Sequence, residues 1–252
     1  EELRSFSVFR RGYDARKKPD ISLVYTVDVD VVDEATVVRR VRGDRNIAPT
    51  PDLAYRPVAQ APAGLRRRPV VIGMGPCGLF AALLLAQMGF RPLILERGKI
   101  VRERTVDTFA FWRRRELNPA SNVQFGEGGA GTFSDGKLHS GVKDPVRGRK
   151  VLEEFVKAGA PEEILTVSKP HIGTFRLVSM VENMRASIQA LGGEIRFQTQ
   201  VADLDLAAPD HRVRGVVLEG GERIETDRVV IAIGHSARDT FAMLHGRGVY
   251  IE

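Results

Sequence analysis

The sequence contains a single cysteine, Cys77, among its 252 residues. One thiol can form neither an internal disulfide nor a Cys-x-x-Cys redox pair, which excludes a disulfide-exchange mechanism within this chain. A chain without disulfides is typical of a reducing compartment, so we expect the protein in the cytoplasm. The amino terminus also lacks a basic segment followed by an apolar one, and no secretory signal peptide is predicted.

The sequence also lacks an apolar run long enough to cross a membrane. The best candidate covers residues 79–88, whereas a membrane-spanning helix needs about 20 apolar residues. The five histidines are scattered, and they suggest neither a nucleophilic triad nor a metal site. With 43% apolar and 28% charged residues, the composition is that of an ordinary globular protein. We therefore expect neither a membrane span nor a bound metal.

The net charge of +6 is carried by clusters of arginine and lysine. These clusters lie at residues 10–11, 16–18, 66–68 and 113–115. Such clusters can attract nucleic acid or anionic substrates. No nucleic-acid-binding motif accompanies them, so we interpret them as solvated surface and do not expect a nucleic-acid partner.

The most informative motif follows a short apolar run. Residues 70–72 (VVI) are β-branched and apolar, as is typical of a parallel strand buried on both faces. The glycines behind them spell G-x-G-x-x-G at Gly73, Gly75 and Gly78. The first glycine permits a tight turn and the second lets the backbone approach a pyrophosphate. The third allows a helix to pack closely on the strand.

The residues after this motif complete a βαβ unit. A helix that is apolar nearly all round is predicted over residues 79–88, and its start can bind a diphosphate. Residues 93–95 (LIL) form the second strand, which ends at Glu96. A carboxylate at that position accepts hydrogen bonds from ribose hydroxyls. The complete unit predicts a dinucleotide-binding site in an α/β fold.

A second glycine-rich stretch, NVQFGEGGAGTFSDGKLH, covers residues 122–139. Five glycines between residues 126 and 136 exclude a regular element and favour close approach of the backbone to a ligand. A flexible linker is the alternative. Phe125, Phe133 and Leu138 favour burial and argue against it, so we predict a ligand-binding loop.

The hydrophobic pattern elsewhere predicts further elements. Strands are expected over residues 21–32, 194–201, 213–218, 223–225 and 229–234, and helices over 101–117, 146–159 and 176–191. The basic residues 10–19 are expected either to form a surface loop or to touch an anionic ligand. The proline-rich residues 48–69 are expected to form an extended linker.

The chain resembles uncharacterised bacterial FAD-dependent dehydrogenases, which look like members of the glutathione-reductase-like flavoprotein superfamily of NAD(P)/FAD-dependent oxidoreductases. The similar segments are VVIGMGPCG, LILERG, GEGGAGTFSDGKL, KPHIGT and DRVVIAIGHSARDT. The resemblance covers nearly the whole chain, and GGAGTFSDGKL is its most specific part. It implies a small basic α+β domain over residues 1–65, followed by a Rossmann-like FAD-binding domain over 66–252. A partial substrate-domain segment would be inserted at about 119–172.

The resemblance also implies which residues contact FAD. The ADP half would lie against the G-x-G-x-x-G turn and Glu96, with Arg97 beside the ribose, while the backbone at Val201 would meet the adenine. The glycine-rich loop would follow the flavin or its pyrophosphate, and Gly234 would end the strand under the cofactor. The implied residues are Gly73, Gly75, Pro76, Cys77, Gly78, Glu96, Arg97, Gly128, Gly129, Ala130, Gly131, Ser134, Asp135, Gly136, Lys137, Val201 and Gly234.

Two departures from the family pattern matter. Phe175 stands where the family has an acidic residue, which puts a role for that position in doubt. The Gly-Asp motif that contacts the ribityl chain late in such sequences does not occur before Glu252. We therefore expect the chain to be the N-terminal portion of a longer flavoprotein.

The expected function is that of an FAD-dependent oxidoreductase of two-electron type, a dehydrogenase or reductase whose substrate is not identified. His139 and Lys137 are candidates for proton handling next to the flavin, with hydrogen bonding within the loop as the alternative. One rival interpretation is an NAD-dependent dehydrogenase with the same fingerprint. The other is a nucleic-acid-binding protein in which a flavin is structural or absent.

Overall fold

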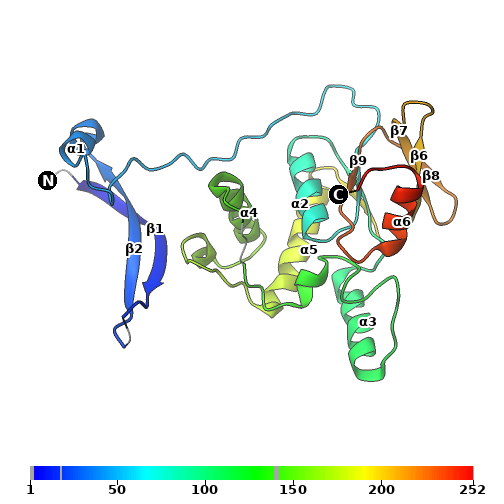
Figure 1. Ribbon diagram of the computed structural model, residues 1–252, viewed down its shortest axis with the longest axis horizontal. Helices are drawn as coiled ribbons and strands as arrows, with labels where there is room; N and C mark the ends of the chain where they lie inside the picture. Colours follow the sequence, from blue (N-terminus) through cyan, green and yellow to red (C-terminus); the bar gives the residue numbers. More distant parts are fainter. Residues whose placement is uncertain (1–2, 18, 139–141, 252) are drawn as a thin grey trace. The chain divides into compact units, whose positions relative to one another are not determined.

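The computed structural model describes residues 3–17, 19–138 and 142–251, and the chain divides into two compact units (Figure 1). The first unit consists of Glu1–Arg56 with Lys137–Ile172, and the second of Pro57–Gly136 with Gly173–Glu252. The sequence predicted a domain boundary near residue 65 and an insertion at about 119–172; the units divide after Arg56, and the segment that interrupts the second unit is Lys137–Ile172. The backbone N–H of Arg11 donates to the carbonyl of Thr166 at 2.7 Å, and the carbonyl of Arg11 accepts from the N–H of Ser168 at 2.9 Å, which joins residues 137–172 to the N-terminal segment.

The second unit is built on a parallel four-stranded sheet of order β5-β4-β3-β9. Its strands are β3 (Val70–Ile72), β4 (Leu93–Leu95), β5 (Glu194–Arg196) and β9 (Val229–Ile231). Val71 pairs with Ile94 on one side and with Val230 on the other, so β3 is central. The predicted Rossmann-like α/β fold is confirmed by this sheet and its crossover helix.

Two helices cover one face of this sheet. The helix α2 (Pro76–Gln87) contacts β3, β4 and β9, and α5 (Thr174–Ala190) contacts α2 and β5. Successive side chains of a strand point to opposite faces. Val71 and Ile94, both fully buried, therefore point away from their neighbours in β3 and β4 and into this layer.

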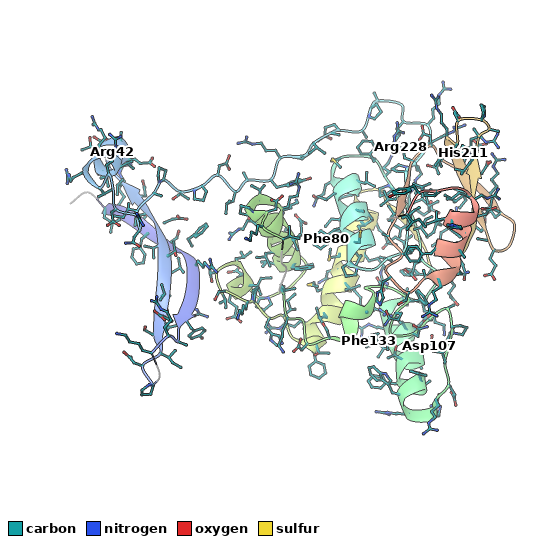
Figure 2. All side chains as sticks on the ribbon, viewed as in Figure 1. Arg42, Phe80, Asp107, Phe133, His211 and Arg228 are labelled. Atoms are coloured by element: carbon teal, nitrogen blue, oxygen red, sulfur yellow. The ribbon has the colours of Figure 1, made fainter. Side chains whose placement is uncertain are left out.

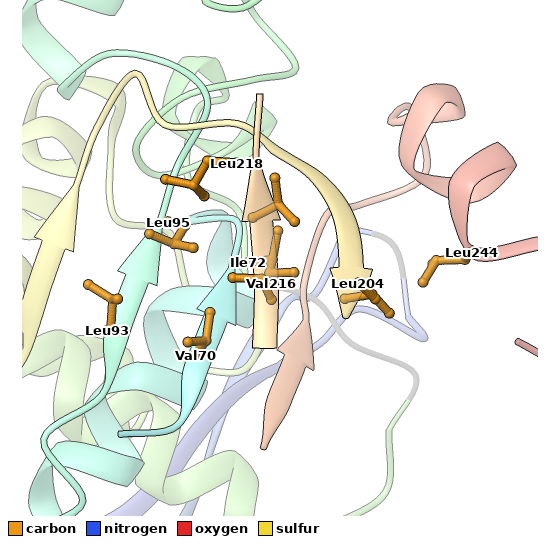
Figure 3. Packing of buried hydrophobic residues seen from close by; sticks show 9 residues of the cluster. Val70, Ile72, Leu93, Leu95, Leu204, Val216, Leu218 and Leu244 are labelled. Atoms are coloured by element: carbon orange, nitrogen blue, oxygen red, sulfur yellow. The ribbon is translucent and has the colours of Figure 1, made fainter. Parts of the chain in front are cut away.

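A second sheet packs on the other face of the four-stranded sheet. It has the order β6-β7-β8, with β6 (Val201–Leu206), β7 (Val213–Leu218) and β8 (Arg223–Glu225). The helix α6 (Arg238–Gly246) contacts β6. Figure 3 shows the shared core, whose buried residues are Val70, Ile72, Leu93, Leu95, Val201, Leu204, Val216, Leu218 and Leu244. Burial on both faces explains why β3 and β4 are apolar throughout.

Two further elements of the second unit lie next to the glycine-rich loop. The helix α3 (Val101–Arg114) follows β4, and η1 (Ala130–Phe133) is a single 3-10 turn inside the loop. The ring of Phe133 lies 5.9 Å from that of Trp112 on α3 (Figure 2). The loop is therefore an ordered part of the fold, as its aromatic residues predicted.

The described part of the first unit contains a long hairpin and three helical segments. The hairpin pairs β1 (Leu3–Asp14) with β2 (Ser22–Val31), and the helices are α1 (Glu34–Arg40), α4 (Pro145–Lys157) and η2 (Glu162–Leu165). Residues 10–19 were expected to form a loop, but β1 continues through Asp14, because its backbone pairs with β2. Most apolar side chains of β2 are exposed, among them those of Leu23, Tyr25 and Val29.

The single strand predicted over residues 194–201 is wrong. The chain leaves the sheet after Arg196, turns through Gln198 at a φ of +53°, and begins β6 at Val201. The backbone N–H groups of Gln198 and Thr199 donate to the carbonyls of Gly98 and Glu96, at 3.0 and 2.9 Å. These contacts draw the segment across the end of β4.

None of the helices in the described ranges has the length and apolar character needed to cross a membrane.

Candidate functional site

A pocket of about 270 Å³ lies in the second unit, at the carboxyl ends of its central strands. It is lined by Gly73, the first residue after β3, by Glu96, the first residue after β4, and by Gly234, which follows β9. Open parallel sheets bind ligands at this edge, next to the strand at which the strand order reverses. Here that strand is β3: the chain continues from β3 to β4 on one side, and β9 pairs with β3 on the other side.

The three fingerprint glycines serve different purposes. A Cβ atom on Gly78 would lie 1.9 Å from the carbonyl oxygen of Gly73, and one on Gly73 would lie 2.5 Å from that of Ala232. The fold itself therefore requires glycine at these two positions. A Cβ atom on Gly75 would meet nothing closer than the Cα of Gly129, at 3.8 Å, and the φ of Gly75 is −71°. Packing does not explain glycine there, but Gly75 lines the pocket at the start of α2.

Glu96 lies at the pocket as predicted, but its carboxylate is buried and already hydrogen-bonded. One oxygen accepts from the backbone of Met74 at 2.7 Å, and the other from Gly98 and Gly126 at 2.8 and 3.1 Å. A carboxylate offers about four acceptor positions, so one remains for a ligand hydroxyl. Glu96 therefore ties three backbone segments together at the edge of the pocket, which the fingerprint alone did not indicate.

Arg97 forms another part of the pocket wall. Its guanidinium donates to Asp239 at 2.8 Å and to Thr240 at 3.2 Å, both at the start of α6, and lies 4.6 Å from the ring centre of Phe125. Burial acts to raise the pKa of Asp239, but the hydrogen bond and charge of Arg97, together with backbone hydrogen bonds at the start of α6, outweigh it and hold that pKa below its ordinary value. The ion pair fixes α6 against the pocket, where Thr240 also lines the wall.

The glycine-rich loop closes the pocket opposite the fingerprint turn. The N–H of Gly128 donates to the carbonyl of Met74 at 2.8 Å. A Cβ atom on Gly129 would lie 3.0 Å from the Cα of Gly75 and 2.9 Å from Pro76, at a backbone φ of +63°. The two glycine-rich segments therefore meet backbone to backbone, which explains glycine in the loop.

The structure brings most of the predicted cofactor residues together. Those that line the pocket are Gly73, Gly75, Pro76, Cys77, Glu96, Arg97, Gly129, Ala130, Gly131, Val201 and Gly234. The predicted residues that do not line it are Gly78, Gly128, Ser134, Asp135 and Gly136. Lys137 belongs to the first unit, where its backbone pairs with His171. His139 lies outside the described residues.

Sequence reasoning missed several pocket residues. Thr199 and Gln200 reach the wall because the chain crosses the end of β4, and Thr240 because α6 is tied to Arg97. These positions depend on tertiary contacts and carry no local motif. Within the described ranges, no group of three or more histidine, cysteine, aspartate or glutamate side chains is arranged to hold a metal ion.

Comparison with known proteins places this architecture in a family. Residues 67–250 match the family described as pyridine nucleotide-disulphide oxidoreductase. An uncharacterised protein of Clostridium beijerinckii is 40% identical over 252 residues, which are all of this chain and 46% of that protein. The chain therefore spans about half the length of this relative.

Solved structures with a similar fold share little sequence with the chain. Thermovibrio ammonificans THI4 is 18% identical with a TM-score of 0.49, covering 73% of this chain and 64% of that one. L-proline dehydrogenase from P. horikoshii is 15% identical with a TM-score of 0.48, covering 74% and 57%. The family assignment therefore depends on the sequence match over residues 67–250 and not on these likenesses. By that match, the chain belongs to the pyridine nucleotide-disulphide oxidoreductase family.

Proposed function

We propose that the pocket binds FAD and that the protein is an FAD-dependent oxidoreductase. The observation that carries this proposal is Gly75. The protein's own packing leaves room for a side chain there, yet the position is glycine and lies on the pocket wall at the start of α2. A diphosphate bound to the first turn of α2 would need that room, because helix N-termini offer free N–H donors and a partial positive charge.

The residues around the pocket fit the parts of FAD. The first turn of α2 and the loop backbone at Gly129 and Gly131 would hold the diphosphate. The free acceptor position of Glu96 suits a ribose hydroxyl, and Val201 lies where the adenine would pack. FAD, when bound, supplies two-electron hydride chemistry, and the protein's residues bind and orient it.

The proposal extends to the catalytic groups, the substrate and the electron donor. Lys137 and His139 follow the glycine-rich loop directly and stay our candidates for proton handling. We propose a small molecule as the substrate or electron donor, with no nucleic-acid partner. We further propose a cytoplasmic location, which the single cysteine of the chain supports.

The visible absorption spectrum of the purified full-length protein tests the proposal. Bound flavin absorbs visible light, so we expect a yellow protein that releases FAD on denaturation. A colourless protein that takes up NAD and not FAD would favour the rival NAD-dependent dehydrogenase, which can use the same fingerprint. Salt-sensitive binding of RNA or DNA without flavin would instead favour the nucleic-acid-binding interpretation.

A further inference from the structure

Arg104 is a fully buried arginine in the first turn of α3. Its guanidinium donates to three backbone carbonyls of the glycine-rich loop (residues 122–136): Asn122 at 2.8 Å, Val123 at 2.7 Å and Glu127 at 2.6 Å. It also lies 4.8 Å from the ring centre of Phe133, at the other end of the same loop. The loop is therefore wrapped around one side chain.

Glu127 anchors the loop to two helices. Its side chain is fully buried, and one carboxylate oxygen accepts from the N–H of Val101 at 2.7 Å and from Arg185 of α5 at 2.8 Å. A carboxylate at the first residue of a helix is stabilised by the helix dipole. Burial lowers the pKa of Arg104 to about 10, although the charges of Glu96 and Glu127 oppose that shift. A buried charge is retained only where partners of this kind surround it.

The loop leaves little room between Arg104 and the fingerprint turn. A Cβ atom on Gly126 would lie 2.4 Å from the Cδ of Arg104. Three residues further on, a Cβ atom on Gly129 would lie 3.0 Å from the Cα of Gly75. The side of the loop that faces away from Arg104 lines the pocket at Gly129 and Gly131. The position of Arg104 therefore sets the distance between the loop and the start of α2.

We propose that Arg104, held in place with Glu127 and Arg185, is a positioning residue that fixes the backbone of the glycine-rich loop for the diphosphate and flavin part of FAD. This inference rests on the proposed function. The planar fork of an arginine can donate to several carbonyls at once, whereas a lysine ammonium is a compact charge without that geometry. The adenosine end of the pocket, at Thr199, Val201 and Thr240, is held by other contacts.

The test compares FAD and AMP binding in Arg104→Lys and in the unaltered full-length protein. We expect the FAD dissociation constant to rise by about tenfold or more, because loss of one charge-assisted hydrogen bond changes an equilibrium by about that factor. AMP affinity should not change. Amide hydrogen exchange over residues 126–129 should accelerate. If Arg104 supplied only a positive charge, lysine would replace it, and Arg104→Lys would keep the FAD affinity of the unaltered protein.

The matched control is Arg102→Lys on the same helix. Arg102 is largely exposed, with 69% of its side chain accessible, and donates to Glu182 instead of to the loop. The Arg102→Lys protein should bind FAD with the affinity of the unaltered protein. If Arg104→Lys does not fold, Glu127→Gln takes its place: its amide oxygen can still accept from Val101, which favours folding, but the ion pair with Arg185 that anchors the loop is lost. We expect weaker FAD binding and unchanged AMP binding in that variant as well.

The outcomes separate this inference from the proposed function. Binding of neither FAD nor AMP by the unaltered protein would overturn the proposed function. Normal FAD affinity in a folded Arg104→Lys or Glu127→Gln protein would overturn the positioning role alone. An equal loss of FAD and AMP affinity would also overturn it, because the effect would then extend beyond the loop.

Discussion

Gly75 and Glu96 show how single residues combine the needs of the fold and of a ligand. Gly73 and Gly78 are glycines because backbone carbonyls lie within 2.5 and 1.9 Å of where a Cβ atom would be, whereas Gly75 has no such neighbour. Glu96 holds three backbone N–H groups and keeps one acceptor position. The motif predicts a turn and close packing for Gly73 and Gly78 and a ligand for Gly75, but it gives no indication that Glu96 also holds the backbone together.

Glu96→Ala should lower stability even without cofactor. The substitution leaves the buried N–H groups of Met74, Gly98 and Gly126 without their acceptor, and each unsatisfied group costs roughly 1–3 kcal/mol. We expect the free energy of unfolding of the cofactor-free protein to fall by at least about 2 kcal/mol in urea denaturation. The control is Glu194→Ala, whose exposed carboxylate pairs with Arg68 and Arg196. Equal stability of Glu96→Ala and the control would contradict the structural role.

At the scale of secondary structure, local pattern predicted the elements that are buried on a regular face. The strands β3, β4, β7 and β8 have the predicted bounds, because short apolar runs and a turn signal define them. The helix α5 was predicted to end at Leu191 but ends one residue earlier, and Leu191 is exposed. The break between β5 and β6 could not be predicted, since hydrogen bonds from Gln198 and Thr199 to the end of β4 cause it.

Arg104 marks the limit of sequence reasoning within the helices. Arginine is almost never fully buried unless paired, so the helix predicted over residues 101–117 gave no indication that Arg104 would belong to the core. The carbonyls that satisfy Arg104 come from residues 18 to 23 positions further along the chain. No periodicity reports such a contact, and only the structure reveals it.

The helix α4 offers a prediction about pH. Glu154 is buried and accepts from Lys150 and Lys157, each at 2.8 Å. Burial acts to raise the pKa of Glu154, but the two lysines outweigh it and hold that pKa below its ordinary value of 4.5. A depressed pKa contributes stability above the unfolded-state pKa, and this stability is lost as the pH falls through the folded-state value.

Glu154→Gln should therefore destabilise the protein by roughly 1–2 kcal/mol at neutral pH. The difference from the unaltered protein should shrink as the pH falls below 4.5, because the native carboxyl then also becomes neutral. Urea denaturation of both proteins at several pH values measures this difference in the free energy of unfolding. The neighbouring Glu153→Gln, whose carboxylate is 40% exposed beside Arg149, should change stability little. A difference for Glu154→Gln that stays constant with pH would contradict the assignment.

At the scale of the whole molecule, the pocket is small for a dinucleotide. Its volume of about 270 Å³ lies below the range of roughly 300–1,000 Å³ found for sites that enclose drug-sized ligands. The chain spans 46% of the length of its Clostridium beijerinckii relative. We infer that further residues of a longer protein complete the walls around the ribityl chain and the flavin ring.

Residues 1–252 alone should therefore hold FAD weakly. We expect this span to lose its flavin during exhaustive dialysis, while the longer protein keeps close to one FAD per chain. Absorbance of the two dialysed samples measures the flavin content. Equal stoichiometry would mean that residues 1–252 contain the complete site.

The central claim, that this pocket is an FAD site, is tested most directly by titrating FAD into Gly75→Val. A Cβ atom at Gly75 would meet nothing closer than the Cα of Gly129 at 3.8 Å, and the φ of −71° suits any residue, so the variant should fold and show the circular dichroism and melting temperature of the unaltered protein. The matched control, Gly220→Val, also lies in open space but in the turn between β7 and β8, and it should bind FAD normally. We predict that Gly75→Val loses FAD binding, because its branched side chain occupies the place of the diphosphate. A folded Gly75→Val protein with its full flavin content would contradict the claim.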